Sequence, residues 1–268
     1  MSNWTKTPIR GILLDMTGTL CDTNSFYEIE TIAGSSEALL KLREANIPIR
    51  FVTNESQVTR ALAQKKLEES GLFMNFNEIF APVPVACQIM KERNLRPHLL
   101  VHSLVLPDFD EIDKTDPNCV VVGDAIEGFT YKNVNKAFQT LMQMENPILF
   151  GLGSGKYYKH GDCLQIDVGA YLAALEYSSG VKAEILGKPS ASFFLSAVRD
   201  MNLKPEEVVM IGDDILNDVG GAQAVGIRGV LVRTGKFRST DENHPTVHPD
   251  AIVDNLSSAV DLILKHRK

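Results

Sequence analysis

The sequence is poor in the patterns that zinc sites and disulfides require. Its 268 residues include four widely scattered cysteines with no C-x-x-C pair, and six histidines that form no H-x-x-x-H motif or His/Cys cluster. Structural zinc sites and disulfide frameworks depend on such spacings. We therefore expect reduced thiols in a cytosolic protein, with no soft-metal chemistry. The four cysteines are Cys21, Cys87, Cys119 and Cys163.

Long apolar runs and an excess of positive charge are also missing. No stretch approaches the roughly 18 apolar residues of a transmembrane helix. The polar start Met1–Arg10 gives no indication of a signal peptide. The formal net charge of -7 argues against nucleic acid or a membrane surface as the main partner. A phosphate substrate would need local attraction from a metal ion, a lysine or backbone amides.

Short apolar runs that alternate with helical patterns are abundant. This alternation predicts a doubly wound, parallel α/β sheet of the Rossmann-like kind, with its ligand site beyond the carboxyl ends of the strands. The strand-like runs are Ile9–Leu14, Ile49–Thr53, Leu99–His102, Cys119–Val122, Ile148–Leu152, Glu184–Leu186, Val208–Ile211 and Gly229–Val232. The helical stretches are Ser35–Ala45, Val58–Ser70, Lys132–Met144, Ala170–Ser178 and Ser190–Met201.

Two interruptions predict domain hinges. Two prolines break the pattern around Ala81–Pro84, and a helix ends around Gly180–Glu184 before the next strand. The segment between them is long enough to form a smaller α/β domain. We therefore expect a core built from residues 1–82 and 183–268, with residues 83–182 as an inserted domain.

The first of four strand-end motifs centres on Asp15. It follows the apolar run Gly11–Leu14 and precedes Thr17-Gly18-Thr19, where Gly18 permits a tight turn. A carboxylate in this place can attack phosphorus, because the strand fixes it and the loop exposes it. The alternative is an aspartate that starts a turn or caps a helix.

The second motif is Thr53-Asn54 at the end of the next run. A hydroxyl and an amide can donate hydrogen bonds to phosphate oxygens. Thr-Asn-x-Ser is also a good helix N-cap, and for this motif alone the cap is the stronger interpretation.

The third motif, Gly187-Lys188-Pro189, follows another strand-like run. Pro189 suits the first turn of a helix, so Lys188 lies at a positive helix start. Lysine is unfavourable there unless an anion is near, which suggests a phosphate or a carboxylate partner. The alternative is an ordinary surface turn.

The fourth motif is Gly212-Asp213-Asp214, with Asp218 four residues further on. Acidic groups at one strand end repel one another unless a cation neutralises them. Mg²⁺ is suited to this task, since it takes one or two carboxylates together with water and substrate. Helix capping is again the alternative.

A parallel sheet would bring these four strand ends to one edge. A nucleophile, hydrogen-bond donors, a lysine and a metal site are the parts of phosphoryl transfer. Two other segments give weaker indications of a site. Gly151–Lys156 matches no nucleotide-binding pattern, and Gly123-Asp124-Ala125 lacks a second aspartate.

The four motifs, in this order, resemble the haloacid dehalogenase superfamily of phosphatases. The resemblance implies Asp15 as nucleophile, and Thr17, Thr53, Asn54 and Lys188 around the phosphate. It implies Mg²⁺ held by Asp15, Asp213 and the main-chain carbonyl of Thr17, supported by Asp214 and Asp218. The inserted segment looks like the C2-type cap of that superfamily.

Further runs resemble one branch of the superfamily nearly end to end. Members of that branch hydrolyse P–N bonds in phospholysine, phosphohistidine and imidodiphosphate, and also inorganic pyrophosphate. The resemblance implies a homodimer in the cytoplasm, and also in the nucleus. The runs are Thr53–Gln57, Ala86–Ile89, Pro117–Val121, Met210–Asp214, Val219–Gln223 and Arg233–Arg238.

Thr17 replaces the second aspartate that most phosphatases of the superfamily carry two residues after the nucleophile. Threonine cannot act as a general acid or base near neutral pH, and losing such help costs about 10²–10⁴-fold in rate. Alcohol leaving groups should therefore be poor. A P–N nitrogen can take its proton from water, and a phosphate leaves readily as an anion. Alternatively, another residue or water supplies the proton.

Two other functions stay open on the sequence alone. One is a phosphatase for a small phosphomonoester such as pyridoxal phosphate or a sugar phosphate, and the other is a non-catalytic binding protein. Lys156, Tyr157, Tyr158 and His160 are candidates to line the cap side of the site, although such clusters are more often solvated faces.

Overall fold

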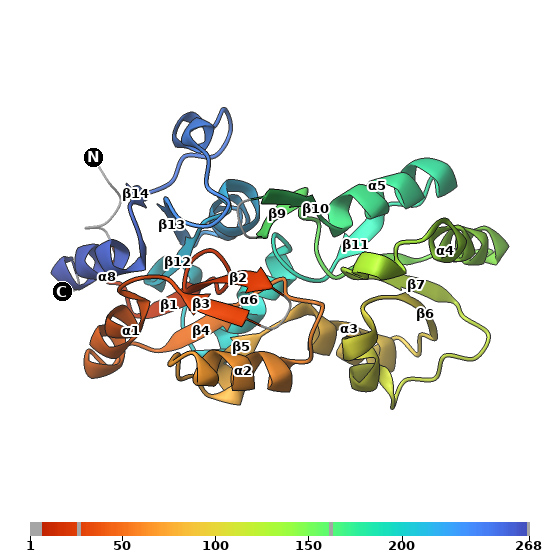
Figure 1. Ribbon diagram of the computed structural model, residues 1–268, viewed down its shortest axis with the longest axis horizontal. Coiled ribbons are helices and arrows are strands. Elements are labelled where there is room, and N and C mark those ends of the chain that lie inside the picture. The colour runs from red at the N-terminus through yellow and green to blue at the C-terminus, as the bar shows by residue number, and fades with distance from the viewer. Residues whose placement is uncertain (1–6, 26–27, 161–162, 267–268) are drawn as a thin grey trace.

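The computed structural model describes residues 7–25, 28–160 and 163–266. Two sheets lie along its long axis, the larger at the left of Figure 1 and the smaller at the right. The larger sheet has six parallel strands in the order β14-β13-β12-β1-β4-β5. Its strands are β1 (Gly11–Leu14), β4 (Ile49–Val52), β5 (Ile79–Phe80), β12 (Val208–Gly212), β13 (Arg228–Val232) and β14 (Ala251–Val253).

The central strands are buried on both faces, as their unbroken apolar sequences require. Side chains alternate across β1, so Ile12 and Leu14 pack on one face while Leu13 packs against Phe193 and Phe194 on the other. The first face is covered by α1 (Ser35–Glu44) and α8 (Leu256–Lys265), and the second by α6 (Ala191–Asp200) with the short α7 (Gly221–Gln223). The helix α2 (Arg60–Glu69) begins after its N-cap Thr59. The parallel, doubly wound core predicted from the sequence is confirmed.

The inserted segment forms the smaller sheet, also parallel, in the order β11-β8-β7-β6. Its strands are β6 (Pro97–Leu100), β7 (Cys119–Val122), β8 (Leu149–Gly151) and β11 (Ala183–Ile185). The helices are α3 (Pro82–Glu92), α4 (Tyr131–Gln143) and α5 (Val168–Ser179). Leu141 of α4 and Leu172 of α5 share one apolar cluster, and Met90 of α3 belongs to another. We call this part the cap.

Both expected hinges coincide with changes of element. Pro82 occupies the first turn of α3, where a missing N–H costs no hydrogen bond, and α3 packs against cap residues from its start. Residues 183–185 were assigned to the core, yet they pair with β8 in the cap sheet. That pairing favours a second boundary after Ile185. The division into core and cap at stated residues stays a prediction.

Several elements were not predicted. The strands β5 and β14 have only two and three residues, too few for a periodic pattern, whereas α3 and α8 have an apolar face that was overlooked. Two antiparallel hairpins were not predicted either. One hairpin pairs β2 (Cys21–Ser25) with β3 (Glu28–Thr31), and the other pairs β9 (Tyr157–His160) with β10 (Cys163–Ile166). The core strand β2 contacts the cap strand β9, so the two hairpins meet above the sheet edge.

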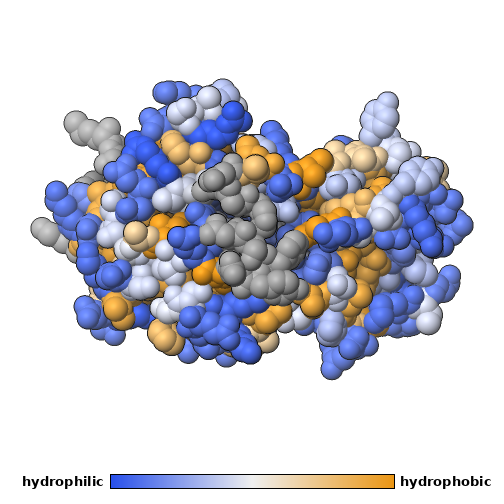
Figure 2. Space-filling view, viewed as in Figure 1, coloured by the Kyte–Doolittle hydropathy of each residue, from blue (hydrophilic) through white to orange (hydrophobic). Residues whose placement is uncertain are grey.

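The outer surface is mainly hydrophilic on the face seen in Figure 2, with apolar residues gathered toward its middle and toward the cap. Of the helices within the described ranges, none has both the length and the apolar character needed to cross a bilayer.

Candidate active site

Three of the predicted strand ends meet where the strand order reverses. The strand β1 lies between β12 and β4, and these strands lead into Asp15, Asp213 and Thr53. The amide of Asp15 donates a hydrogen bond to the carbonyl of Ile211 at 2.9 Å, which fixes the start of the loop after β1. Such a switch point is the ligand-binding edge of an open parallel sheet.

Lys188 reaches this edge from the cap–core crossing and joins two carboxylates. Its Nζ lies 2.5 Å from Asp15 Oδ1 and 2.7 Å from Asp218 Oδ1. The lysine is only 3% exposed. Burial alone would lower its pKa, but the charges of Asp15 and Asp218 outweigh that effect and raise the pKa. Lys188 is therefore a permanent cation at neutral pH, buried beside the candidate nucleophile.

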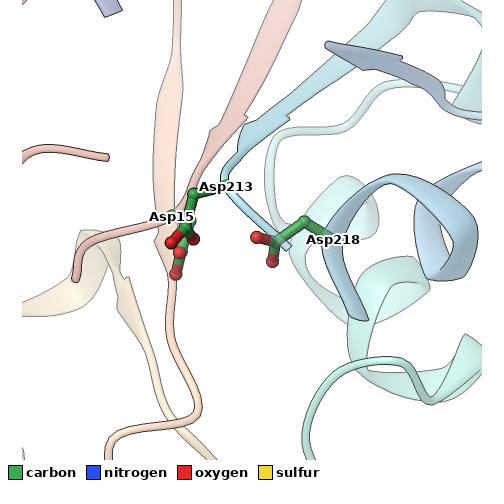
Figure 3. A group of neighbouring side chains, drawn as sticks. All are labelled: Asp15, Asp213 and Asp218. Atoms are coloured by element: carbon green, nitrogen blue, oxygen red, sulfur yellow. The ribbon is translucent and has the colours of Figure 1, made fainter. Parts of the chain in front are cut away.

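Asp15, Asp213 and Asp218 form an acidic cluster suited to a hard cation. Each offers an oxygen within 4.8 Å of the others, and Figure 3 shows the Asp218 carboxylate directed toward the other two. Asp213 is 1% exposed, and its Oδ1 has no hydrogen-bond partner among the described residues. Burial raises the pKa of Asp213, with Lys236 opposing the shift. A buried carboxylate oxygen without a donor is what a divalent cation with oxygen ligands requires.

Two glycines hold Asp213 between neighbouring loops. Gly18 has φ 87° and Gly235 has φ 58°, and a Cβ at either position would overlap Asp213 Oδ2. Thr234 Oγ1 donates to the carbonyl of Gly18, which ties the two loops together. The amide of Lys236 donates to Asp213 Oδ2 at 2.7 Å, and Oδ1 is left without a hydrogen-bond partner among the described residues.

Asp214 serves as the N-cap of the π-helical turn Ile215–Gly220. Its Oδ1 accepts hydrogen bonds at 2.9 Å from the amides of Leu216 and Asn217. Its Oδ2 lies 3.2 Å from Lys236 Nζ. The capping alternative considered for this motif therefore applies to Asp214. Lys236 was not singled out as a site residue, since nothing in its local sequence distinguishes it from a solvated lysine.

Asn54 ties the second motif to the third. Its Nδ2 donates to the carbonyl of Lys188 at 2.8 Å, and its Oδ1 accepts from the amide of Lys188 at 2.7 Å. These bonds position the Lys188 loop, which is a different contact from the expected donation to phosphate. Thr53 is buried, and its Oγ1 accepts from the Glu55 amide at 3.0 Å.

A cavity of about 370 Å³ opens onto all of these groups. Besides the four motifs it is lined by Thr17, and by Glu55, Asp124, Tyr158 and Asp167. Asp124, not predicted as a site residue, thus belongs to the same cavity as Asp15. The missed signal was its place at the end of the apolar strand β7, equivalent to that of Asp15 after β1.

Of the residues expected to line the cap side of the site, some line the cavity and others do not. Tyr158 lines the cavity, whereas Lys156 is exposed and does not. Tyr157 is half-buried and also lies outside the lining. The side chain of His160 lies outside the described part of the structure.

Comparison with known proteins gives the family. A haloacid dehalogenase-like hydrolase model matches residues 12–112, and a HAD-hydrolase-like model matches residues 185–259. The phospholysine phosphohistidine inorganic pyrophosphate phosphatase of Xenopus laevis is 52% identical, over 98% of this chain and 97% of its own. That of Homo sapiens is 50% identical over 99% of both chains. This chain belongs to the phospholysine phosphohistidine inorganic pyrophosphate phosphatase family.

The fold comparison agrees with this assignment. The solved 4-nitrophenylphosphatase of Thermotoga maritima matches with a TM-score of 0.84 at 25% identity, covering 95% of this chain and 97% of that one. The phospholysine phosphohistidine inorganic pyrophosphate phosphatase family lies within the haloacid dehalogenase-like hydrolases, so the superfamily inferred from the four motifs is confirmed. The chain is a phosphohydrolase, with a Rossmann-like core and a cap.

Proposed function

We propose that this family member is a Mg²⁺-dependent phosphohydrolase that acts through an aspartyl-phosphate on Asp15. Its proposed substrates are the P–N bonds of phospholysine, phosphohistidine and imidodiphosphate, and inorganic pyrophosphate. The observation that carries the proposal is the 2.5 Å contact between Lys188 Nζ and Asp15 Oδ1 at the floor of the cavity. The substrate class is taken from the names of relatives that are 50% and 52% identical to this chain.

The chain's own residues account for the first chemical step. One carboxylate oxygen of Asp15 attacks phosphorus, forming the O–P bond while the bond to the leaving group breaks and the leaving atom keeps the electron pair. Lys188 attracts the phosphoryl oxygens, and Asp218 holds the lysine from its other side. The buried Thr53 offers a hydroxyl to the same phosphoryl group. Water then attacks the aspartyl-phosphate and releases inorganic phosphate.

The metal site is proposed from the acidic cluster and its unpaired oxygen. Asp15, Asp213 and the main-chain carbonyl of Thr17 would hold Mg²⁺, with Asp214 and Asp218 behind them. When bound, the ion neutralises negative charge on the phosphoryl group and on the carboxylates around it. Lys236 supports Asp213 by donating its amide and by its charge.

Thr17 supports the choice of leaving group. It lines the cavity beside Asp15 in the place where a second carboxylate would supply a proton. Without that proton donor the favoured substrates are those whose leaving group takes a proton from water or departs as a stable anion. P–N compounds and pyrophosphate meet this condition, and unactivated phosphomonoesters do not.

The expected homodimer and the cytoplasmic and nuclear location also remain part of this proposal, supported by the resemblance to the family. Light scattering on the purified chain measures the first. For the catalytic proposal, phosphate release with and without Mg²⁺ is compared for wild type and Asp15→Asn. We expect activity on the P–N substrates and pyrophosphate above that on phosphoserine, pyridoxal phosphate and sugar phosphates. Equal activity in the two proteins contradicts the role of Asp15.

A further inference from the structure

Three acidic side chains that have no part in the proposed phosphoryl chemistry line the cavity. Glu55 comes from the core loop after β4, Asp124 from the end of the cap strand β7, and Asp167 from the N-cap of α5. All three line the same cavity as Asp15 and Lys188. We call Glu55, Asp124 and Asp167 the acidic wall.

The wall is built from contacts that fix its position. Gln57 Nε2 donates to Asp124 Oδ2 at 2.7 Å, and the Asp124 amide donates to Ser56 Oγ at 3.0 Å. Since Ser56 and Gln57 belong to the loop that carries Thr53, Asp124 of the cap is held in register with the core site. Asp167 Oδ1 accepts from the Val168 amide at 2.6 Å, and Glu55 Oε1 accepts from the Gln57 amide at 2.5 Å.

Few cationic groups among the described side chains act on the wall. Asp124 is only 8% exposed, and no salt bridge between described side chains involves Glu55, Asp124 or Asp167. Lys236 opposes the rise in the pKa of Asp167, and His102 opposes that of Asp124. The acids also act on one another, and burial first and then mutual repulsion raise the pKa of Glu55. Burial, Asp124 and Asp167 raise the pKa of Tyr158, which lies beside them, to about 12. A cationic group on a ligand would add to this partial charge compensation.

The spacing of the wall suits an organic cation better than a metal ion held by all three acids. Within the described residues, the single group of three acids whose oxygens come within 4.8 Å of one another is Asp15, Asp213 and Asp218. The wall's oxygens are too dispersed for one metal ion, and each member already accepts a hydrogen bond from the protein. A dispersed set of carboxylates suits a protonated amine or imidazole, whose charge and N–H groups spread over several ångströms.

The same cavity connects the acidic wall with the proposed metal and phosphoryl site. Asp213 Oδ1, nearly fully buried, lines it without a hydrogen-bond partner among the described residues. The metal and phosphoryl end of a ligand would lie at Asp213 and Lys188, which leaves the rest of the cavity, with the wall, for the leaving group.

We propose that the acidic wall binds the cationic nitrogen of the leaving group and thereby selects phosphoramidates of basic amines over anionic phosphates. This inference rests on the proposed function and adds to it the source of substrate choice. The nitrogen of the P–N bond is protonated from water, the wall stabilises that positive charge, and the bond then breaks with its electron pair staying on nitrogen. The amine leaves neutral. The wall thus takes over part of the task that Thr17 cannot perform.

Isosteric amide variants remove the charge of each wall residue with little change in shape. Glu55→Gln and Asp167→Asn each keep an oxygen for the local donor, and asparagine remains a good N-cap at 167. Asp124→Asn keeps one of two acceptors, so it retains the bond from Gln57 Nε2 at the expense of the longer one from the Ile126 amide. Glu69→Gln on the exposed face of α2 is the matched control for loss of one negative charge.

Binding gives a readout that does not depend on turnover. Calorimetry with Mg²⁺ and inorganic phosphate present compares Nα-acetyl-lysinamide with its neutral isostere Nα-acetyl-norleucinamide. Wild type and Glu69→Gln should bind the lysine compound at least about tenfold more tightly, and each wall variant should lose about that factor. Equal affinities for the two compounds in wild type, or an unchanged preference in all three wall variants, overturn the proposal.

Kinetics separates this inference from the proposed function. Each wall variant should lower kcat/KM for phospholysine about tenfold and leave pyrophosphate hydrolysis unchanged or faster. An equal fall on both substrates contradicts the wall while the phosphohydrolase proposal stands. Loss of the proposed function would show instead as wild-type turnover that does not depend on Asp15, whatever the amine affinities.

Discussion

Lys188 Nζ lies 2.5 Å from Asp15 Oδ1, although 173 positions separate the two residues in the sequence. The contact places a buried cation against the candidate nucleophile, and Asp218 lies on the other side of the same ammonium at 2.7 Å. Two carboxylates and one lysine thus form a unit whose members depend on one another. Its chemistry and its stability can be tested separately.

Replacing Lys188 should lower both the activity and the stability of the protein. Lys188→Met should lower phosphate release by about 10²–10³-fold, because a preorganised charge at the phosphoryl group is lost. It should also lower the free energy of unfolding by about 3–5 kcal/mol, because two buried carboxylates lose their partner. Steady-state kinetics and urea unfolding measure the two effects.

A second substitution distinguishes the loss of stability from the loss of activity. Adding Asp218→Asn to Lys188→Met should restore part of the stability and none of the activity. Lys41→Met, which breaks the exposed pair with Asp261, should change stability by about 1 kcal/mol at most. A Lys188→Met protein as stable as wild type would contradict the buried unit.

Gly18 gives a test of the metal site. Gly18→Ala forces a side chain into the carboxylate of Asp213 at a backbone φ of 87°. Calorimetric Mg²⁺ affinity should fall at least about tenfold, because moving a ligand costs a large part of its interaction. Gly71→Ala is the matched control, since its φ is 80° but open space surrounds it. The control should lose about 1–2 kcal/mol of stability and keep its Mg²⁺ affinity; equal Mg²⁺ affinities in the two variants would argue against Asp213 as a ligand.

Thr17 should control the range of leaving groups. Thr17→Asp restores a carboxylate where most of the superfamily has one, and it should raise kcat/KM for phosphoserine by about 10²-fold through general acid catalysis. Turnover of phosphohistidine should change little, because its nitrogen needs no enzymic acid. The ratio of the two rates is the measurement. If the variant hydrolyses phosphoserine no faster than wild type, Thr17 does not limit the substrate range.

The acidic wall should cost stability at neutral pH. Burial raises the pKa of Asp124, so the folded state resists its ionisation more than the unfolded chain does. That penalty is present where the unfolded carboxylate is charged, and it disappears as the pH falls below the unfolded pKa of about 3.9. Asp124→Asn should therefore raise the melting temperature at pH 8 by about 2–4 °C, with a gain of about 1 kcal/mol.

The pH dependence of the melting temperature tests whether the charge of Asp124 causes this change in stability. Melting curves in EDTA from pH 8 to pH 4 should show the gain of Asp124→Asn shrinking toward zero as the pH falls. A variant that is less stable than wild type at pH 8 would mean that the hydrogen bonds of Asp124 outweigh its burial.

The sequence was sufficient for the core and for the residues at its strand ends. Asp15, Thr53 and Asp213 each follow an apolar run, and parallel strands bring such ends to one edge whatever the details of packing. The hairpins β2/β3 and β9/β10 were not predicted, because each strand has only four or five residues of mixed polar and apolar character. The pairing of their strands cannot be predicted from the hydrophobic periodicity of the sequence.

The rest of the site depends on how the cap meets the core. Asp124 and Asp167 reach the cavity only because the cap sheet faces the core edge, and Gln57 and Ser56 join the two across the crossing. Lys236 becomes a site residue through its contacts with the Asp213–Asp214 pair. The spacing of residues in the sequence gives no information on how the cap packs against the core. These residues could therefore be assigned only from the structure.

The most direct test of the account is to look for the aspartyl-phosphate. The enzyme is mixed with Mg²⁺ and 4-nitrophenyl phosphate, quenched in acid within milliseconds, digested and examined by mass spectrometry, with Asp15→Asn and the exposed Asp261→Asn as controls. The account predicts a phosphoryl group on the peptide that contains Asp15 in wild type and in Asp261→Asn, and none in Asp15→Asn. Active wild-type enzyme without a phosphorylated Asp15, or with the label on another residue, would contradict it.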